Sequence, residues 1–267
     1  MDAMPSAVQS LSSRTVGTDD DDGDEVFGPR KEATITLAKT SARTFPEAMF
    51  SLGSDFYLTG QYVNVEELAI GIQQPDMERL IRDLVTQQLT ISSRVFCKPI
   101  SVFSSAVATF YAPSDKCGTG GMRTERIRAT PSWRKGEGRY DCVLVKDPSR
   151  PTSPNTLRDF SVARVRAFFS STYRDVRYAF ALIHSFEFAY EEPDQDTGMW
   201  IVKCPRDPCA RLVPLDAIYR AAHLIPVYYG NGRVQKTQTA ERSLDQYRFF
   251  YVNKFIDHHA FEIGHEH

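Results

Sequence analysis

Long apolar runs and a cationic signal sequence are missing from this chain of 267 residues, and its cysteines are few. No run approaches the roughly 20 apolar residues that cross a bilayer, so we expect no membrane segment. Met1 to Ser13 has no cationic start followed by an apolar stretch, which argues against a secretory signal. The five cysteines are odd in number and scattered, which is typical of reduced thiols in an intracellular protein.

The chain also lacks a large excess of either charge, since it contains 32 Lys and Arg residues and 34 Asp and Glu residues. This balance excludes a histone-like protein, so any contact with nucleic acid must come from a local patch. A hydrophobic fraction of 42% is sufficient for a core, and 12% aromatic residues argue against wholesale disorder. At about 100–200 residues per domain, the length allows one large domain or two small ones.

The first 92 residues divide into two segments of different character. Residues 1–44 hold an acidic run at positions 19–25 and few large hydrophobic residues, which predicts a disordered leader, with an acidic interaction tail as the alternative. Residues 45–92 form a helical segment, in which Pro75 suits the first turn of a helix. The residues that follow at helical spacing are Met77, Leu80, Ile81, Leu84 and Gln88. Their apolar stripe should dock on the domain that follows.

Residues 93–232 are rich in β-branched and aromatic residues and contain many turn signals. The strand candidates here and just before are Thr90–Phe96, Ser101–Tyr111, Tyr140–Val145, Val162–Phe168, Tyr178–Phe188, Met199–Val202 and Arg211–Ile218. Because no helices separate most of them, we expect a mostly antiparallel, barrel-like β domain. The predicted fold class is therefore α+β, with flanking helices and a disordered acidic N-terminus.

Residues 233–267 combine a polar linker with a closing amphipathic helix. The string Ser243-Leu244-Asp245-Gln246 resembles a capping box. Leu244, Tyr247, Tyr251, Phe255 and His258 follow at helical spacing. One function class is thus a protein–protein module, in which Leu244–His259 contacts a partner or a second copy of the chain.

Several uncommon strings occur in order between Ser101 and His267. They include Phe110-Tyr111-Ala112-Pro113-Ser114-Asp115, Ile127-Arg128-Ala129-Thr130-Pro131-Ser132-Trp133-Arg134, Val162-Ala163-Arg164-Val165-Arg166, Arg220-Ala221-Ala222-His223-Leu224-Ile225-Pro226-Val227-Tyr228 and Tyr251-Val252-Asn253-Lys254. This succession resembles the C-terminal region of fungal (basidiomycete) Plavaka-type transposases, which are CACTA-like DNA transposons. In that family the nuclease core lies upstream, so the resemblance implies a transposase tail without its catalytic domain. It implies no catalytic residue, and we expect no enzyme and no cofactor.

A weaker similarity concerns the order of strands. Val162–Phe169, Tyr178–Phe186 and Val213–Ile218 resemble the strand order of bromo-adjacent-homology domains, which are chromatin-associated barrels. The two resemblances together imply a non-catalytic domain in the nucleus that binds DNA or a chromatin partner. A non-functional remnant of a transposon reading frame is the alternative.

A basic and aromatic cluster between residues 123 and 140 is the candidate nucleic-acid site. Its members are Arg123, Arg126, Arg128, Trp133, Arg134, Lys135 and Arg139. Six of them are basic, and subtracting Glu125 and Glu137 leaves a local surplus of four positive charges. Guanidinium groups match phosphate oxygens, and an exposed Trp can stack on a base. The alternative is a solvated loop that Trp133 anchors to the β domain.

The remaining chemically interesting groups do not predict a site. Possible metal ligands gather at the C-terminus without a distant partner: Asp257, His258, His259, Glu262, His265 and His267. Cys204 and Cys209 are predicted to be incidental loop thiols. Gly118–Gly121 lacks the ending of a phosphate loop and is predicted to be a turn. His184 and His223 are expected in the core or at its edge, and Met199 and Trp200 in the core. We expect no metal.

Overall fold

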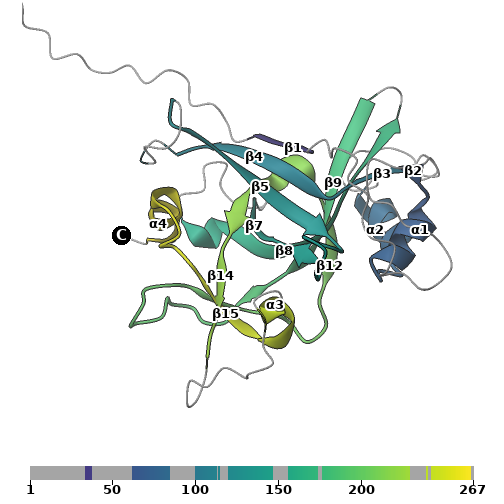
Figure 1. The fold of residues 1–267 in the computed structure, drawn as a ribbon. Coiled ribbons are helices and arrows are strands. Elements are labelled where there is room, and N and C mark those ends of the chain that lie inside the picture. The colour runs from purple at the N-terminus through teal and green to yellow at the C-terminus, as the bar shows by residue number, and fades with distance from the viewer. Residues whose placement is uncertain are drawn as a thin grey trace, which may run out of the picture. The chain divides into compact units, whose positions relative to one another are not determined.

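Antiparallel strands dominate the computed structural model (Figure 1), which describes residues 34–37, 62–84, 100–112, 114, 120–146, 156–173, 176–228, 239 and 242–265. All of them belong to one unit, Lys31–His267. Its longest pairing joins β8 (Phe160–Tyr173) to β9 (Val176–Ser185). Every strand pairing in this part of the chain is antiparallel. The predicted α+β class with a mostly antiparallel sheet is confirmed.

The strands form three sheets. The central sheet contains β12 (Ala210–Pro214), β9, β8, β3 (Ile100–Phe103) and β2 (Tyr62–Val63), with β7 (Cys142–Lys146) and β13 (Ile218–Ala222) joined to β8 through β7. The second contains β1 (Thr34–Leu37), β4 (Ser105–Tyr111), β5 (Met122–Thr130) and β6 (Arg139–Tyr140). The third contains β10 (Glu187–Phe188), β11 (Ile201–Lys203), β15 (Phe249–Val252) and β14 (Leu224–Pro226). Among the described strands each sheet keeps open ends, so the barrel expectation is not confirmed.

The main core lies between the second sheet and the central sheet. Alternate residues of β4, namely Ala106, Ala108 and Phe110, are fully buried, as the two-residue period of a strand requires. They pack in one cluster with residues of the central sheet such as Val165 and Ile183. The predicted strand Ser101–Tyr111 is interrupted at Ser104, because β3 pairs with β8 in one sheet while β4 pairs with β5 in the other.

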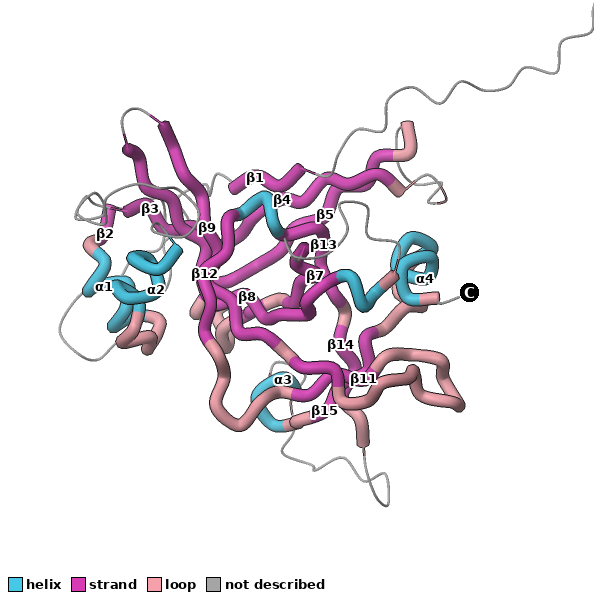
Figure 2. The backbone as a smooth tube through the Cα atoms, turned by 180° about the vertical axis from the view of Figure 1, so that it is seen from behind, coloured by secondary structure: helices cyan, strands magenta, loops and turns pink. Residues whose placement is uncertain are grey.

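Two helices cover one end of the central sheet, beside β2, β3 and β12 (Figure 2). Helix α1 (Val65–Gly71) begins with a capping box between Asn64 and Glu67. Helix α2 (Met77–Leu84) confirms the helix that was predicted after Pro75. Its residues Met77, Ile81 and Leu84 are buried in a cluster with residues of β3, β8, β9 and β12, so the predicted docking is confirmed. Gln88 and the candidate strand Thr90–Phe96 lie outside the described residues.

A third cluster surrounds Trp200, which is 1% exposed and packs with Val202, Phe250 and Ile263. The prediction that Trp200 and Met199 belong to the core is confirmed. Two short 3-10 turns complete the described elements, Leu157–Asp159 before β8 and Leu215–Ala217 before β13. The predicted strand Arg211–Ile218 is thus divided, since β12 ends at Pro214, the second turn follows, and β13 begins at Ile218.

Two sequence predictions need correction. Strand β1 lies inside segment 1–44, where disorder was expected, and it pairs with β4 because Ile35 and Leu37 can pack on the main core. The acidic run at 19–25 lies outside the described residues. The prediction of a closing helix over Leu244–His259 is wrong. That stretch forms α3 (Ser243–Gln246), then strand β15, then α4 (His258–Gly264).

The aromatic residues of β15 explain the second error. Phe249, Phe250 and Tyr251 favour strands, and β15 pairs with β11 on one side and β14 on the other. Arg242, and not Ser243, occupies the N-cap of α3, and no side chain caps that helix. The helix that was predicted to mediate a homo-oligomer is therefore not formed. The homo-oligomer itself stays a prediction.

The docking of α2 can be tested by truncating Met77. Met77→Ala removes a fully buried side chain and should lower the free energy of unfolding by about 2–5 kcal/mol. Glu78→Ala, on the exposed face of the same helix, should change it by less than about 0.5 kcal/mol. Urea denaturation of both variants measures the difference, and equal effects would show that α2 does not depend on its buried face.

Candidate nucleic-acid interface

A groove of about 860 Å³ contains most of the predicted basic cluster. Its walls come from β5, the loop between β5 and β6, β13, α3 and the segment before α4. Of the seven predicted site residues, the groove brings together Arg123, Arg126, Trp133, Arg134 and Arg139. Arg128 and Lys135 do not line it.

The loop that carries Trp133 is held by hydrogen bonds of its own. The Trp133 amide donates to the Glu137 carbonyl at 3.1 Å, and the Gly136 amide donates to the Trp133 carbonyl at 2.9 Å. The Ser132 hydroxyl donates to the Gly136 carbonyl at 3.2 Å. At Gly138, a Cβ atom would lie 3.1 Å or less from two carbonyl oxygens, so a larger residue would disturb this turn. The loop therefore presents its charges from a defined conformation.

Trp133 gathers three of the predicted cations. The guanidinium of Arg128 lies 4.4 Å from the centroid of the indole ring, and those of Arg134 and Arg139 lie 5.6 Å from it. At these distances the negative face of the ring attracts each cation. The indole is half-buried, so it serves as an organising centre for the charges. A base could stack only on a face of this ring that the guanidiniums leave free.

The cations of the groove differ in their partners. Arg139 donates to the Asp141 carboxylate at 2.7 Å, and Arg123 lies 3.7 Å from the Asp257 carboxylate. Arg126 donates to the Ser105 hydroxyl at 3.1 Å, and the guanidinium of Arg134 lies 5.6 Å from the centroid of the Trp133 ring. Within the described residues, Arg126 and Arg134 are therefore exposed cations without a carboxylate partner.

Two acidic residues that could neutralise them are engaged elsewhere. The Glu137 carboxylate accepts a hydrogen bond from Nε of Arg242 at 2.7 Å. The Glu125 carboxylate turns inwards, accepts a hydrogen bond from the Ala221 amide and lies 3.8 Å from Arg220. Arg126 and Arg134 lie on what we call the lip of the groove. The acids near this lip therefore leave both charges uncompensated.

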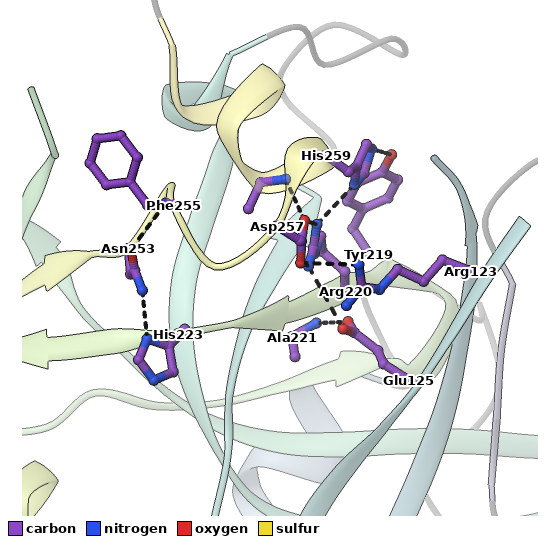
Figure 3. Close-up of polar contacts among 11 residues, drawn as sticks. Arg123, Glu125, Tyr219, Arg220, Ala221, His223, Asn253, Phe255, Asp257 and His259 are labelled. Atoms are coloured by element: carbon purple, nitrogen blue, oxygen red, sulfur yellow. Dashed lines mark hydrogen bonds and ion pairs between the residues drawn. The ribbon is translucent and has the colours of Figure 1, made fainter. Parts of the chain in front are cut away.

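The floor of the groove contains a buried ion network that sequence analysis missed (Figure 3). Arg220, on β13, is 2% exposed and donates two hydrogen bonds to the Asp257 carboxylate, at 2.9 and 2.6 Å. A further contact of 2.9 Å joins its guanidinium to Nδ1 of His259. From the sequence, Asp257 and His259 were considered only as metal ligands, and Arg220, which stands among mostly apolar residues, was given no role.

Burial and charge act in opposite directions on the two acids of this network. Burial alone would raise the pKa of Asp257, but hydrogen bonds from Arg220 and from the Ala260 amide lower it to about 2. Burial raises the pKa of Glu125, and Arg220 and the Ala221 amide offset only part of that rise. The Nη atoms of Arg220 are directed at groups of the protein, so the floor differs from the lip, where cations face solvent.

A second ion pair fixes the far wall. Arg164 of β8 donates to both carboxylate oxygens of Asp245 on α3, with 3.2 Å between Nη2 and Oδ2. The guanidinium of Arg164 also lies 5.6 Å from the ring of Tyr140. Because Arg164 lines the groove together with Tyr140, the ion pair between Arg164 and Asp245 holds α3 against the groove.

The remaining candidate residues lie apart from one another. Among the described residues, no three His, Cys, Asp or Glu side chains are placed to hold a metal ion. Cys204 is half-buried and Cys209 exposed, while Cys117 and His267 lie outside the described residues. His184 is half-buried on β9, and burial lowers its pKa to about 4. No helix in the described ranges is long and apolar enough to cross a membrane.

The Arg220–Asp257 pair predicts a dependence of stability on pH. The pKa of Asp257 falls from 3.8 to about 2 on folding, so its stabilising contribution is complete above pH 3.8 and is lost as the pH falls through 2. Asp257→Asn should lower stability at neutral pH and flatten the decline of stability over that acid range. Urea denaturation at several pH values measures this, with the exposed Asp216→Asn as the control. A decline as steep as in the wild type would contradict the assignment.

Comparison with known proteins identifies no relative: no family model, no curated protein and no solved structure matches the chain. The resemblance to Plavaka-type transposases therefore stays an expectation from the sequence.

Proposed function

We propose that this chain is a non-catalytic module that binds nucleic acid through the phosphate backbone along the lip of the groove. The observation that carries the proposal is the pair Arg126 and Arg134, two exposed guanidiniums without a carboxylate partner in the described residues. They lie in a chain with a formal net charge of -2, so the positive surface is a local feature. The resemblance to DNA transposases favours DNA as the ligand and the nucleus as the location.

The contacts available at the lip suit phosphates more than bases. Guanidiniums donate to phosphate oxygens in a fork geometry, and such contacts position a strand without reading its sequence. Trp133 already holds three guanidiniums, which supports the interpretation of this residue as an organiser of charge. We therefore expect affinity that depends strongly on salt and weakly on sequence.

Removal of the two unpaired cations tests the proposal. Each phosphate contact contributes about one unit to the slope of log affinity against log salt, so Arg126→Ala/Arg134→Ala should reduce that slope by about two. Fluorescence anisotropy with labelled duplex and single-stranded DNA, between about 50 and about 200 mM salt, measures the slope.

The matched control is Arg206→Ala/Arg211→Ala. It removes the same charge from two exposed arginines that do not line the groove. The control should retain the wild-type slope. An equal loss of slope in both double variants would show a general effect of net charge, and no binding by the wild type at low salt would refute the proposal.

Trp133 provides an independent test, because it acts on affinity through its neighbours. Trp133→Ala should weaken DNA binding about tenfold, since Arg134 and Arg139 lose the ring that orients them. Trp133→Phe keeps an aromatic face and should recover part of the loss. Titration of the same DNA with both variants measures the two affinities. An equal loss of affinity in both would mean that the indole binds DNA directly or only fills space, and would contradict its role in orienting the arginines.

A further inference from the structure

An exposed aromatic patch adjoins the groove at the start of α4. Six large hydrophobic side chains are exposed among the described residues, and three of them lie within seven positions of the chain. These are Phe255, which is 60% exposed, Ile256, which is 50% exposed, and Phe261, which is 39% exposed. Single exposed hydrophobic residues need no explanation, but a contiguous group of them is typical of a binding surface.

The rings of the patch contact one another, with Phe255 tilted by 42° against Phe261 and His265 stacked on Phe261. The centroids of Phe255 and Phe261 are 5.9 Å apart, and His265 stacks on Phe261 at 5.0 Å with an angle of 14° between the planes. Phe255 is fixed through its amide, which donates to Oδ1 of Asn253 at 3.0 Å. The side-chain nitrogen Nδ2 of Asn253 lies 3.1 Å from Nδ1 of His223, a residue of the groove wall (Figure 3).

A cation accompanies these rings. Nζ of Lys254 lies 5.4 Å from the centroid of Phe255 and 5.6 Å from that of Phe261. Only 8% of the Lys254 residue is exposed, and no carboxylate in the described part of the chain pairs with it. Aromatic faces beside an uncompensated ammonium suit a ligand that is both aromatic and anionic, whereas an apolar partner would leave the ammonium poorly solvated.

The patch and the groove are continuous along the chain. Ile256 and Asp257, which directly follow Phe255, both line the groove. A strand whose phosphates follow the lip therefore lies within reach of the patch with its bases. In a duplex the bases are stacked inside the helix and present no free face, whereas a single strand can turn its bases outwards.

We propose that Phe255 and Phe261, with Lys254 beside them, stack the unpaired bases of a single-stranded nucleic acid. This inference rests on the proposed function and names the form of nucleic acid that the site prefers. Stacking of bases on aromatic side chains tolerates any sequence, since every base has an aromatic face.

The experiment compares oligo(dT) with a duplex of the same length, using the full chain. Phe255→Leu/Phe261→Leu keeps apolar bulk and removes both aromatic faces, so affinity for the single strand should fall about tenfold. Affinity for the duplex and the salt slope should not change. Phe255→Tyr/Phe261→Tyr keeps the faces and should bind the single strand within about twofold of the wild type.

Tyr190→Leu is the control, because Tyr190 is 54% exposed and does not line the groove. It should bind both ligands as the wild type does. Thermal melting verifies that each variant is folded. If the double leucine variant unfolds, Phe255→Leu alone gives the same comparison, since its ring is the more exposed of the two.

Three results would overturn the inference. Single-strand affinity that survives both leucine substitutions, with the salt slope still dependent on Arg126 and Arg134, would refute stacking and retain the proposed function. A concentration-dependent dimer that Phe255→Asp abolishes would assign the patch to a second copy of the chain. Absence of salt-dependent binding to either form of DNA would refute the inference and the proposed function together.

Discussion

The buried pair of Arg220 and Asp257 is the constraint on which the arrangement of this surface depends. It joins β13 to the residue that caps α4, and through Glu125 it also reaches β5. Those segments carry the lip of the groove on one side and the aromatic patch on the other. Removing charged groups from water costs several kcal/mol for each ion, so such a network persists only where its geometry recovers that cost.

The geometry of the network meets most of this requirement. Asp257 accepts from Arg220 and from the Ala260 amide, so one carboxylate both neutralises the guanidinium and caps the helix. His259 contacts Arg220 and the hydroxyl of Tyr219. Nε of Arg220 is buried without a hydrogen-bond partner, which is the one polar cost that its contacts do not cover. Its guanidinium lies 4.7 Å from the ring of Phe110, so the network also rests on the main core.

The contrast between floor and lip gives the groove its electrostatic character. Every acid that lines it, namely Glu125, Glu137, Asp141 and Asp257, contacts an arginine. Of the arginines in the lining, only Arg126 and Arg134 lack a carboxylate partner in the described residues. The local surplus of charge that the sequence predicts at 123–140 is thus real in composition, but among the arginines that line the groove it remains uncompensated only at these two side chains in the described residues. Which charges remain uncompensated depends on residues far along the chain, such as Arg242 and Asp257.

Sequence alone could predict the elements whose signal is local. The stripe of Met77, Ile81 and Leu84 defines α2, because helical spacing and the packing face coincide within eight residues. The prediction of a closing helix failed because the spacing from Leu244 to His258 fits a helix. The strand β15 forms instead by pairing with β11 and β14, which lie far away in the sequence. The floor of the groove was equally hidden, since Arg220 and Asp257 are 37 residues apart and only the folded sheets bring them together.

The same distinction explains why a basic cluster in a sequence does not by itself define what a surface binds. Trp133 looked like a stacking residue, yet three guanidiniums lie within 5.6 Å of the centroid of its ring. Phe255 was assigned to the face of a closing helix, whereas in the structure it precedes α4 and is exposed, as is Phe261 on α4. In the proposed complex, the phosphate contacts are made by β5 and the loop after it, and the base contacts by Phe255 and by Phe261 of α4. A ligand that engages both has to adapt its backbone to two separate segments of the protein, and a flexible single strand does so at a lower cost than a stiff duplex.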